Sequence, residues 1–336
     1  MFVRGKDYMT KVKICGITNL EDALASAKFG ADALGFNFYE KSPRYVAPEK
    51  VGEIVEQLPN EILKVGVFVN ESLEKIVEIA TTAKLDALQL HGEETPAFAK
   101  ELKARTALKI IKAFRVSPEF KPEDVLQYQT DAILLDAYSR HEHGGTGETF
   151  DWEIAKRVQE IFPKMYLAGG LSNGNIDYAL RQTNSFAVDS CSCLEETKGK
   201  KDRIKLINFI TKVKQFDWWF EISNLENYRI TNIYEYLNLI HLRPALYIGS
   251  YSITALGSFI VGFKAALQLI PNDFEWKKFH GFEFHEFIKM KLNKLNYASF
   301  NGFNATLYEC DEETALDYFF ALLEEFKLEK ENLGKN

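Results

Sequence analysis

Eight short apolar segments alternate with amphipathic helical segments between residues 12 and 214, and this alternation constrains the fold more than any other feature. The predicted strands are rich in β-branched residues and cover 12–17, 33–39, 63–69, 87–91, 109–116, 132–137, 164–169 and 186–192. The predicted helices include 19–29, 48–58, 71–82, 95–104, 150–161, 175–182 and one marked by Ile204, Ile207, Ile210 and Val213. Compact strand–helix units in this number favour a closed (β/α)8 TIM barrel over an open doubly wound sheet.

The aromatic content rises after Gln215. Of the 45 Phe, Tyr and Trp residues, 25 follow this position, and a chain of 336 residues is longer than one hydrophobic core usually serves. We therefore expect a leader over 1–10, where Met9 could be the natural start, a barrel over 11–215, and a smaller α-rich (α+β) domain over 216–336. The predicted elements of this second domain are helices at 231–241, 252–270, 283–295 and 311–327 and a strand at 303–309.

Composition narrows the class of protein. A net charge of -7 argues against binding to nucleic acid or to an acidic membrane surface. The four cysteines show no disulfide spacing and no secretory leader precedes them, which indicates a reducing cytoplasm. The longest nearly apolar run, 255–270, is broken by Lys264 and Gln268 and is too short to cross a bilayer.

Polar side chains stand at the carboxyl ends of three predicted strands. Residues two apart on a strand share a face, so Lys13 pairs with Cys15, and Gln89 pairs with His91. Asp136 ends the sixth strand. Each has an ordinary structural explanation, since single cysteines are usually buried apolar residues and aspartates often cap turns. Together, a thiol and a carboxyl at strand ends suggest proton-transfer chemistry on a barrel.

Seven short motifs extend this pattern along the barrel. They are KICGIT (13–18), ALGFNF (33–38) with SPRY (42–45), VGVFVN (65–70), QLHG (89–92), LLD (134–136), GGTG (144–147) with FDW (150–152), and LAGGL (167–171). Each motif is weak alone, but all of them in order at strand ends are specific. Over about residues 11–214 the chain resembles the phosphoribosylanthranilate isomerase family of tryptophan biosynthesis.

The resemblance implies an Amadori rearrangement, in which N-(5-phosphoribosyl)anthranilate, an aminoaldose, becomes an aminoketose. It assigns Cys15 as the general base and Asp136 as the general acid. The thiol must then be kept largely as a thiolate, for which the Lys13 cation is a candidate, and the carboxylic acid must stay protonated near neutrality. Arg44 matches the arginine that engages the anthranilate carboxylate.

The resemblance also implies where the substrate binds. The expected binding residues are Lys13, Arg44, Gln89, His91, Gly145, Gly147, Gly169, Gly170 and Ser192. The phosphate is expected on backbone N–H groups after strands seven and eight. The loop after strand eight departs from the family, because Cys193 stands where glycine is commonest and Lys198 replaces the usual proline.

The implied chemistry needs one acid and one base, so we expect no metal and no organic cofactor. A zinc site built from Cys191, Cys193, His141 and His143 is a poor alternative, because their spacing differs from the usual C-x2-C pattern.

Two other interpretations of the barrel stay open. One is a different phosphosugar enzyme similar to indole-glycerol-phosphate synthase, although that enzyme's lysine-rich signature is missing. The other is a degenerate barrel that serves as a scaffold. Residues 216–336 faintly resemble an uncharacterised bacterial domain and could provide a protein partner's binding site, self-association or a stabilising appendage.

Overall fold

The computed structural model describes residues 9–137, 150–223, 237–238, 240–241, 256 and 312–333. The chain divides into two compact units, Met1–Lys214 and Gln215–Asn336. Within the described residues, no helix is both long enough and apolar enough to cross a membrane.

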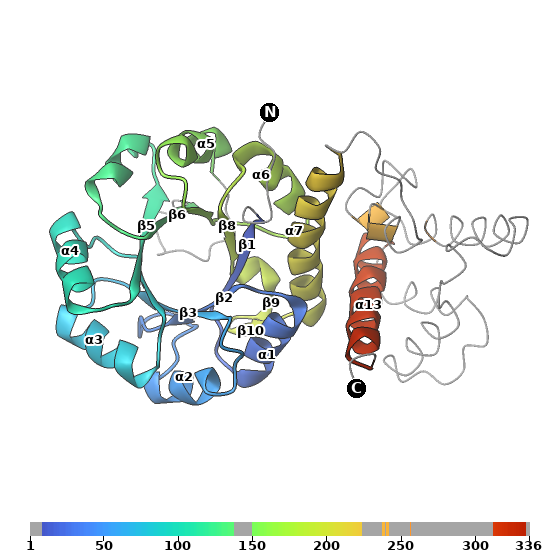
Figure 1. Ribbon diagram of the computed structural model, residues 1–336, viewed down its shortest axis with the longest axis horizontal. Coiled ribbons are helices and arrows are strands. Elements are labelled where there is room, and N and C mark those ends of the chain that lie inside the picture. Colours follow the sequence, from blue (N-terminus) through green and yellow to red (C-terminus); the bar gives the residue numbers. More distant parts are fainter. Residues whose placement is uncertain are drawn as a thin grey trace, which may run out of the picture. The chain divides into compact units, whose positions relative to one another are not determined.

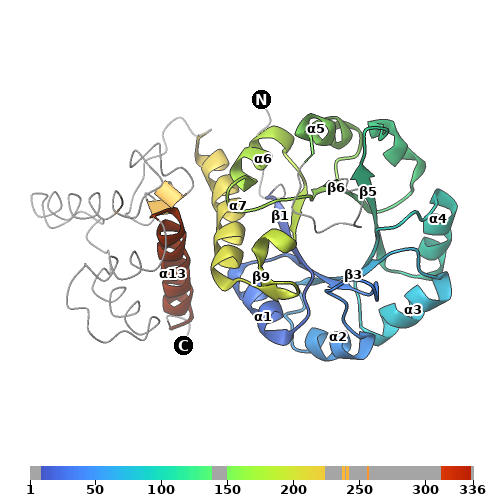
Figure 2. The ribbon, with the colours of Figure 1, turned by 180° about the vertical axis from the view of Figure 1, so that it is seen from behind.

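The first unit contains a closed barrel of eight parallel strands that are hydrogen-bonded in chain order, with β1 also pairing with β8 (Figures 1 and 2). The strands are β1 (Lys11–Cys15), β2 (Ala33–Asn37), β3 (Leu63–Phe68), β4 (Ala87–Leu90), β5 (Lys109–Val116), β6 (Ala132–Ala137), β7 (Met165–Leu167) and β8 (Ala187–Ser190). The predicted barrel class is therefore confirmed.

Helices form a ring outside the strands in Figures 1 and 2. They are α1 (Leu20–Phe29), α2 (Pro48–Val55), α3 (Leu73–Thr82), α4 (Pro96–Arg105), α5 (Trp152–Ile161), α6 (Ile176–Thr183) and α7 (Arg203–Ser223). Their starts follow from local chemistry, since the side chains of Asn19, Ser72 and Thr95 accept hydrogen bonds from the first turns of α1, α3 and α4. α7 runs through the boundary between the two units.

Two connections and two strand ends differ from the predicted pattern. Between β5 and β6 the chain forms the short 3-10 helix η2 (Pro122–Gln127) in place of an α-helix, with Pro122 at its first position. Glycines in the left-handed region also shorten strands: Gly16 (φ +74°) ends β1 at Cys15, and Gly169 (φ +84°) follows the end of β7. After β8 come the 3-10 helix η3 (Ser192–Leu194) and a hairpin of β9 (Glu195–Thr197) and β10 (Lys200–Lys201), neither of which was predicted.

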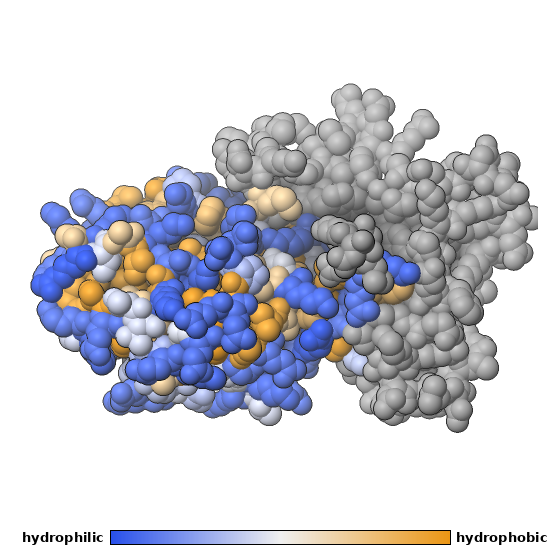
Figure 3. Space-filling model, turned by 60° about the horizontal axis from the view of Figure 1, so that its bottom comes forward, coloured by the Kyte–Doolittle hydropathy of each residue, from blue (hydrophilic) through white to orange (hydrophobic). Residues whose placement is uncertain are grey.

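The strands separate two apolar layers. Val12 and Ile14 on β1 are fully buried. A second cluster of buried residues comes from alternate positions of seven strands: Ala33, Val65, Ala87, Ile111, Ala113, Ala132, Leu134, Tyr166, Ala168 and Ala187. This cluster fills the barrel interior beneath the strand ends, so it supports polar side chains placed one step further along the same strands. On the outside, Figure 3 shows hydrophilic and hydrophobic residues interspersed over the barrel face in view.

In the second unit the structure describes α13 (Glu312–Leu333), where the sequence predicted a helix at 311–327. Most of α13 between residues 315 and 326 is buried, and the Phe320 ring stacks on His241 with 4.2 Å between ring centroids. Four residues of the predicted helix 231–241 are helical, namely 237, 238, 240 and 241. The predicted elements at 283–295 and 303–309, and all of 252–270 except residue 256, lie outside the described residues.

Candidate active site

A pocket of about 330 Å³ opens where the barrel strands end. Eight of the eleven predicted site residues line it: Cys15, Arg44, Gln89, His91, Asp136, Gly169, Gly170 and Ser192. Gly145 and Gly147 lie outside the described residues. Lys13, expected to bind substrate, is not among the lining residues and lies fully buried.

Lys13 is held by an ion pair across two adjacent strands. It stands opposite Asp189 in the β1–β8 register, and its Nζ lies 2.8 Å from Asp189 Oδ2. Burial disfavours the Lys13 cation, but Asp189 and Cys15 outweigh this effect and raise the pKa of Lys13 above its ordinary value. Lys13 therefore acts on the pocket by its charge and its position, without lining it.

Cys15 ends β1 at the floor of the pocket. Hydrogen bonding with Cys191 and burial raise the pKa of Cys15 well above its ordinary value, while Lys13 and Lys201 lower it by less. The sequence suggested that Lys13 could keep this thiol as a thiolate. Lys13 does lower the pKa of Cys15, as expected, but by less than Cys191 and burial raise it.

Cys191, which the sequence offered only as a ligand of the poor zinc alternative, lines the pocket. The hydrogen bond from Cys15 lowers the pKa of Cys191 to about 7; burial opposes this shift, and Lys201 and Arg44 favour it. The sequence could have indicated this role only through the position of Cys191, one residue beyond β8. The β1–β8 register pairs Ile14 with Ser190, so Cys191 comes next to Cys15. The two thiols therefore influence each other's protonation.

Asp136 sits at the end of β6 in a fixed orientation. Its Oδ1 accepts a hydrogen bond of 2.9 Å from the N–H of Ala137, and its Oδ2 lies 3.2 Å from His91 Nε2. His91 is in turn oriented by Gln89, whose Nε2 lies 2.8 Å from His91 Nδ1. A carboxyl that is only 7% exposed and fixed in this way can direct a proton to one position in the pocket.

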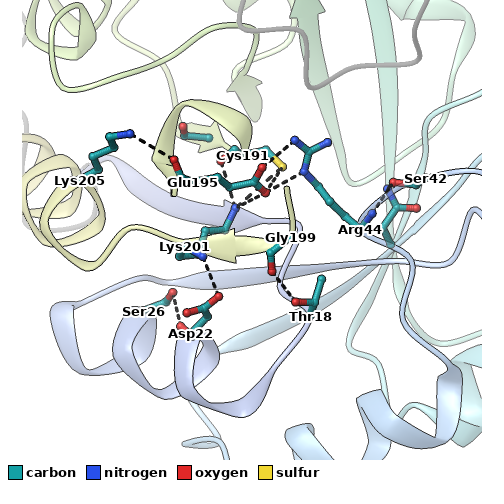
Figure 4. Close-up of polar contacts among 12 residues, drawn as sticks. Thr18, Asp22, Ser26, Ser42, Arg44, Cys191, Glu195, Gly199, Lys201 and Lys205 are labelled. Carbon is teal, nitrogen blue, oxygen red and sulfur yellow. Dashed lines mark hydrogen bonds and ion pairs between the residues drawn. The ribbon is translucent and has the colours of Figure 1, made fainter. Parts of the chain in front are cut away.

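Arg44 is buried and already bound to a carboxylate of the protein. Its Nε and Nη2 donate hydrogen bonds of 2.8 Å each to the two carboxylate oxygens of Glu195, which raise the pKa of Arg44 (Figure 4). Lys201 also contacts Glu195, at 3.3 Å. Among the described residues nothing accepts a hydrogen bond from Nη1 of Arg44, so the Nη1–Nη2 edge is the one that can meet a second carboxylate.

Backbone and lysines form a further part of the pocket lining. Gly170 (φ +60°) adopts the left-handed conformation like Gly169, and a Cβ on Gly169 would lie 2.5 Å from the Ala137 nitrogen. Ser192 begins η3 here. Lys41 and Lys198, which were not predicted, also line the pocket and add positive charge. Exposed N–H groups and cations suit a phosphate.

Three buried polar atoms of pocket residues have no hydrogen-bond partner among the described residues: Gln89 Oε1, His91 Nε2 and Asp189 Oδ1. Buried polar groups are rarely left without a partner. They therefore mark positions where a polar ligand would supply hydrogen bonds.

The described residues include no cluster of three or more His, Cys, Asp or Glu side chains placed to hold a metal. His141 and His143, of the zinc interpretation set aside above, lie outside them.

Comparison with known proteins places this site in a family context. Residues 12–212 match the family model described as N-(5'phosphoribosyl)anthranilate (PRA) isomerase. The N-(5'-phosphoribosyl)anthranilate isomerase of Pelobacter propionicus is 48% identical over 207 residues, which are 62% of this chain and 97% of the relative.

Solved structures are similar over the same part. The phosphoribosyl anthranilate isomerase of Thermotoga maritima has 43% identity and a TM-score of 0.57, covering 62% of this chain and 99% of that one. A phosphoribosyl anthranilate isomerase in complex with reduced 1-(o-carboxyphenylamino)-1-deoxyribulose 5-phosphate has 43% identity and a TM-score of 0.55, covering 61% and 99%.

Proposed function

Because the chain belongs to the N-(5'-phosphoribosyl)anthranilate isomerase family through residues 12–212, we propose that it converts N-(5'-phosphoribosyl)anthranilate to 1-(2-carboxyphenylamino)-1-deoxyribulose 5-phosphate in tryptophan biosynthesis. The observation that carries the proposal is the convergence of a thiol, a carboxyl and an arginine from three distant segments on one pocket. A related enzyme bound to a reduced form of this product supports the same ligand class here, a small phosphosugar.

Asp136 begins the reaction in this proposal. Its proton goes to the furanose ring oxygen, the C1′–O bond breaks, and the C1′–N bond becomes a protonated imine, because the nitrogen keeps its own proton. The His91 contact and the Ala137 N–H fix the carboxyl, so that the proton is delivered at one place. The imine then makes the C2′ proton acidic enough for a thiolate to remove.

Cys15 takes the C2′ proton as a thiolate. The electrons released form the C1′–C2′ double bond of an enol-amine, which becomes the aminoketose when C1′ gains a proton and the C2′ hydroxyl loses one. The reaction only moves protons within the substrate, so acid and base end each turnover as they began. One acid and one base suffice, and the proposal includes no metal or cofactor.

The two charged ends of the substrate set its direction in the pocket. We assign the anthranilate carboxylate to the free edge of Arg44, and the phosphate to the backbone of Gly169 and Gly170 with Ser192. Gln89 lines the pocket, and its buried Oε1, which has no partner among the described residues, suits a sugar hydroxyl. This orientation places the ribose between Cys15 and Asp136.

A direct test is turnover of N-(5'-phosphoribosyl)anthranilate by the purified full chain, with the product identified by mass and chromatography. Complementation of an isomerase-deficient tryptophan auxotroph by the full chain tests the same activity in cells. The Cys15→Ser chain is the matched control for both. Growth and turnover with the wild-type chain alone would support the proposal, whereas no turnover by a folded wild-type chain would overturn it.

A further inference from the structure

The two sulfurs in the pocket come from neighbouring strands at the same level. In the β1–β8 register Lys13 stands opposite Asp189 and Ile14 opposite Ser190, so Cys15 and Cys191 occupy the next step. Adjacent strands lie about 4.8 Å apart, and side chains at one level of a parallel pair share a face. The Lys13–Asp189 contact of 2.8 Å shows that side chains two residues earlier on this face do meet.

Two glycines hold the sulfurs in this arrangement. A Cβ on Gly35 would lie 2.7 Å from Cys15 Sγ, and a Cβ on Gly16 would lie 2.7 Å from Cys191 Sγ. Both positions are closer than real Cβ contacts allow, so each sulfur packs directly on a glycine backbone. The thiols therefore have little freedom to turn away from each other.

Charged groups enclose the pair on every side. Those facing it are Lys13 on β1, Arg44 after β2, Asp189 on β8, Glu195 on β9 and Lys201 on β10. Lys201 lies 4.0 Å from Cys191 Sγ and donates a 3.1 Å hydrogen bond to the Cys191 carbonyl, while Glu195 Oε1 lies 3.9 Å from the same sulfur (Figure 4). Lys13, Arg44 and Lys201 are three cations, whereas Glu195 is one carboxylate and burial raises the pKa of Asp189 to about 7, so the surroundings favour one negative charge on the two sulfurs.

The titration of the two thiols agrees with one shared proton. Their hydrogen bond raises the pKa of Cys15 and lowers that of Cys191 to about 7. When two groups interact this strongly, the first proton leaves the pair as a unit. These opposite shifts favour the loss of one proton from the pair near neutral pH, although burial alone would raise the pKa of both thiols.

We propose that Cys191 is a further catalytic residue, the proton partner of Cys15: the two sulfurs share one proton, and Cys15 becomes the thiolate that attacks C2′–H by passing its proton to the Cys191 thiolate. The S–H bond of Cys15 breaks as that of Cys191 forms, and no other reactant is needed. After C2′ proton removal Cys15 is a thiol again. The inference rests on the proposed function, because it assumes that Cys15 is the base.

The experiment measures two quantities in the full chain: the pH dependence of kcat/KM, and the ultraviolet absorbance of thiolate without substrate. In the wild type, both should rise with a midpoint near pH 7. Cys191→Ala should move both midpoints up by about one pH unit or more, which lowers kcat/KM at pH 7 about tenfold and restores it at higher pH. Cys191→Ser should show a similar loss. A serine hydroxyl can donate a hydrogen bond to the Cys15 thiolate, but near neutral pH it is not deprotonated and cannot accept the proton of the Cys15 thiol.

The controls separate the possible failures. Cys193→Ser removes a thiol from the same loop and should leave both midpoints in place. If Cys191→Ala keeps the wild-type midpoints while Cys15→Ser is inactive, the inference is wrong and the proposed function stands. If Cys15→Ser retains turnover, Cys15 is not the base and the inference fails, although the proposed function stands. A folded wild-type chain without turnover would overturn the proposed function. The absorbance titration still decides whether the sulfurs share a proton.

Discussion

Glu195 binds Arg44 through both carboxylate oxygens, Oε1 to Nε and Oε2 to Nη2, at 2.8 Å each. The two residues are 151 positions apart, and burial leaves both side chains at most 10% exposed. A planar guanidinium held along one edge presents its other edge in a fixed direction. The carboxylate clamp proposed for the substrate thus depends on a carboxylate of the protein.

We expect Glu195→Gln to raise KM more than it lowers kcat, because an amide cannot hold both nitrogens of Arg44 as acceptor. It should also lower the free energy of unfolding by about 1–3 kcal/mol, since the buried Arg44 and Lys201 lose their counter-charge. Kinetics and denaturant unfolding measure the two effects. Glu196→Gln is the matched control, as the adjacent Glu196 is exposed. An unchanged KM would contradict the positioning role.

Arg44→Ala should raise KM by about 10–100-fold, the loss expected when a charge-assisted hydrogen bond to the substrate carboxylate is removed. Arg44→Lys should recover little, because an ammonium cannot bind Glu195 and a second carboxylate along two edges. Steady-state kinetics with each chain give the comparison. A fall in kcat with KM unaltered would argue against a carboxylate clamp.

Cys15→Ser should lower kcat by about 10²–10⁴-fold while KM changes little, because a hydroxyl is too weak a base at neutral pH. Cys310→Ser, in the second unit, removes a thiol far along the chain and serves as the control. The measurement is kcat under saturating substrate. Retention of more than half of the wild-type kcat would remove Cys15 from the role of base.

Asp136→Asn should lower kcat by a similar ~10²–10⁴-fold, because an amide cannot supply the ring-opening proton. Asp131→Asn is a control just before the opposite end of β6, where the carboxylate accepts a 2.8 Å hydrogen bond from the Ile110 N–H. That change should lower Tm and leave kcat near the wild-type value. Equal kcat in the two variants would show that Asp136 is not the acid.

The barrel unit should isomerise without the second unit. A chain ending at Ser223 keeps all of α7, and one ending at Lys214 stops at the boundary between the units. We expect both to fold and to match the full chain in kcat/KM, because all described pocket residues precede the boundary. An inactive barrel that recovers when the tail is added in trans would show that the two units depend on each other.

The sequence predicted the barrel because eight apolar strands alternate with amphipathic helices. This alternation depends on residues close together in the sequence, so it can be recognised without the structure. It predicted Cys15 and Asp136 because they stand at strand ends, and Arg44 because the SPRY motif resembles the family's. The Arg44–Glu195 pair has no such signal, since the partners meet only through barrel closure and the β9–β10 hairpin. Lys13 shows the opposite error: its motif suggested substrate contact, but its level on β1 places it beneath the pocket against Asp189.

The lack of space for a side chain at Gly16 limits which mutations the active site can tolerate. A side chain there would lie 2.7 Å from both Arg44 Cδ and Cys191 Sγ, on a backbone with φ +74°. Every missense mutation of this codon adds a Cβ. Each such mutation therefore disturbs both Arg44 and Cys191. Selection for isomerase activity should therefore constrain codon 16 as severely as the codon of Cys15, although Gly16 itself takes no part in the reaction.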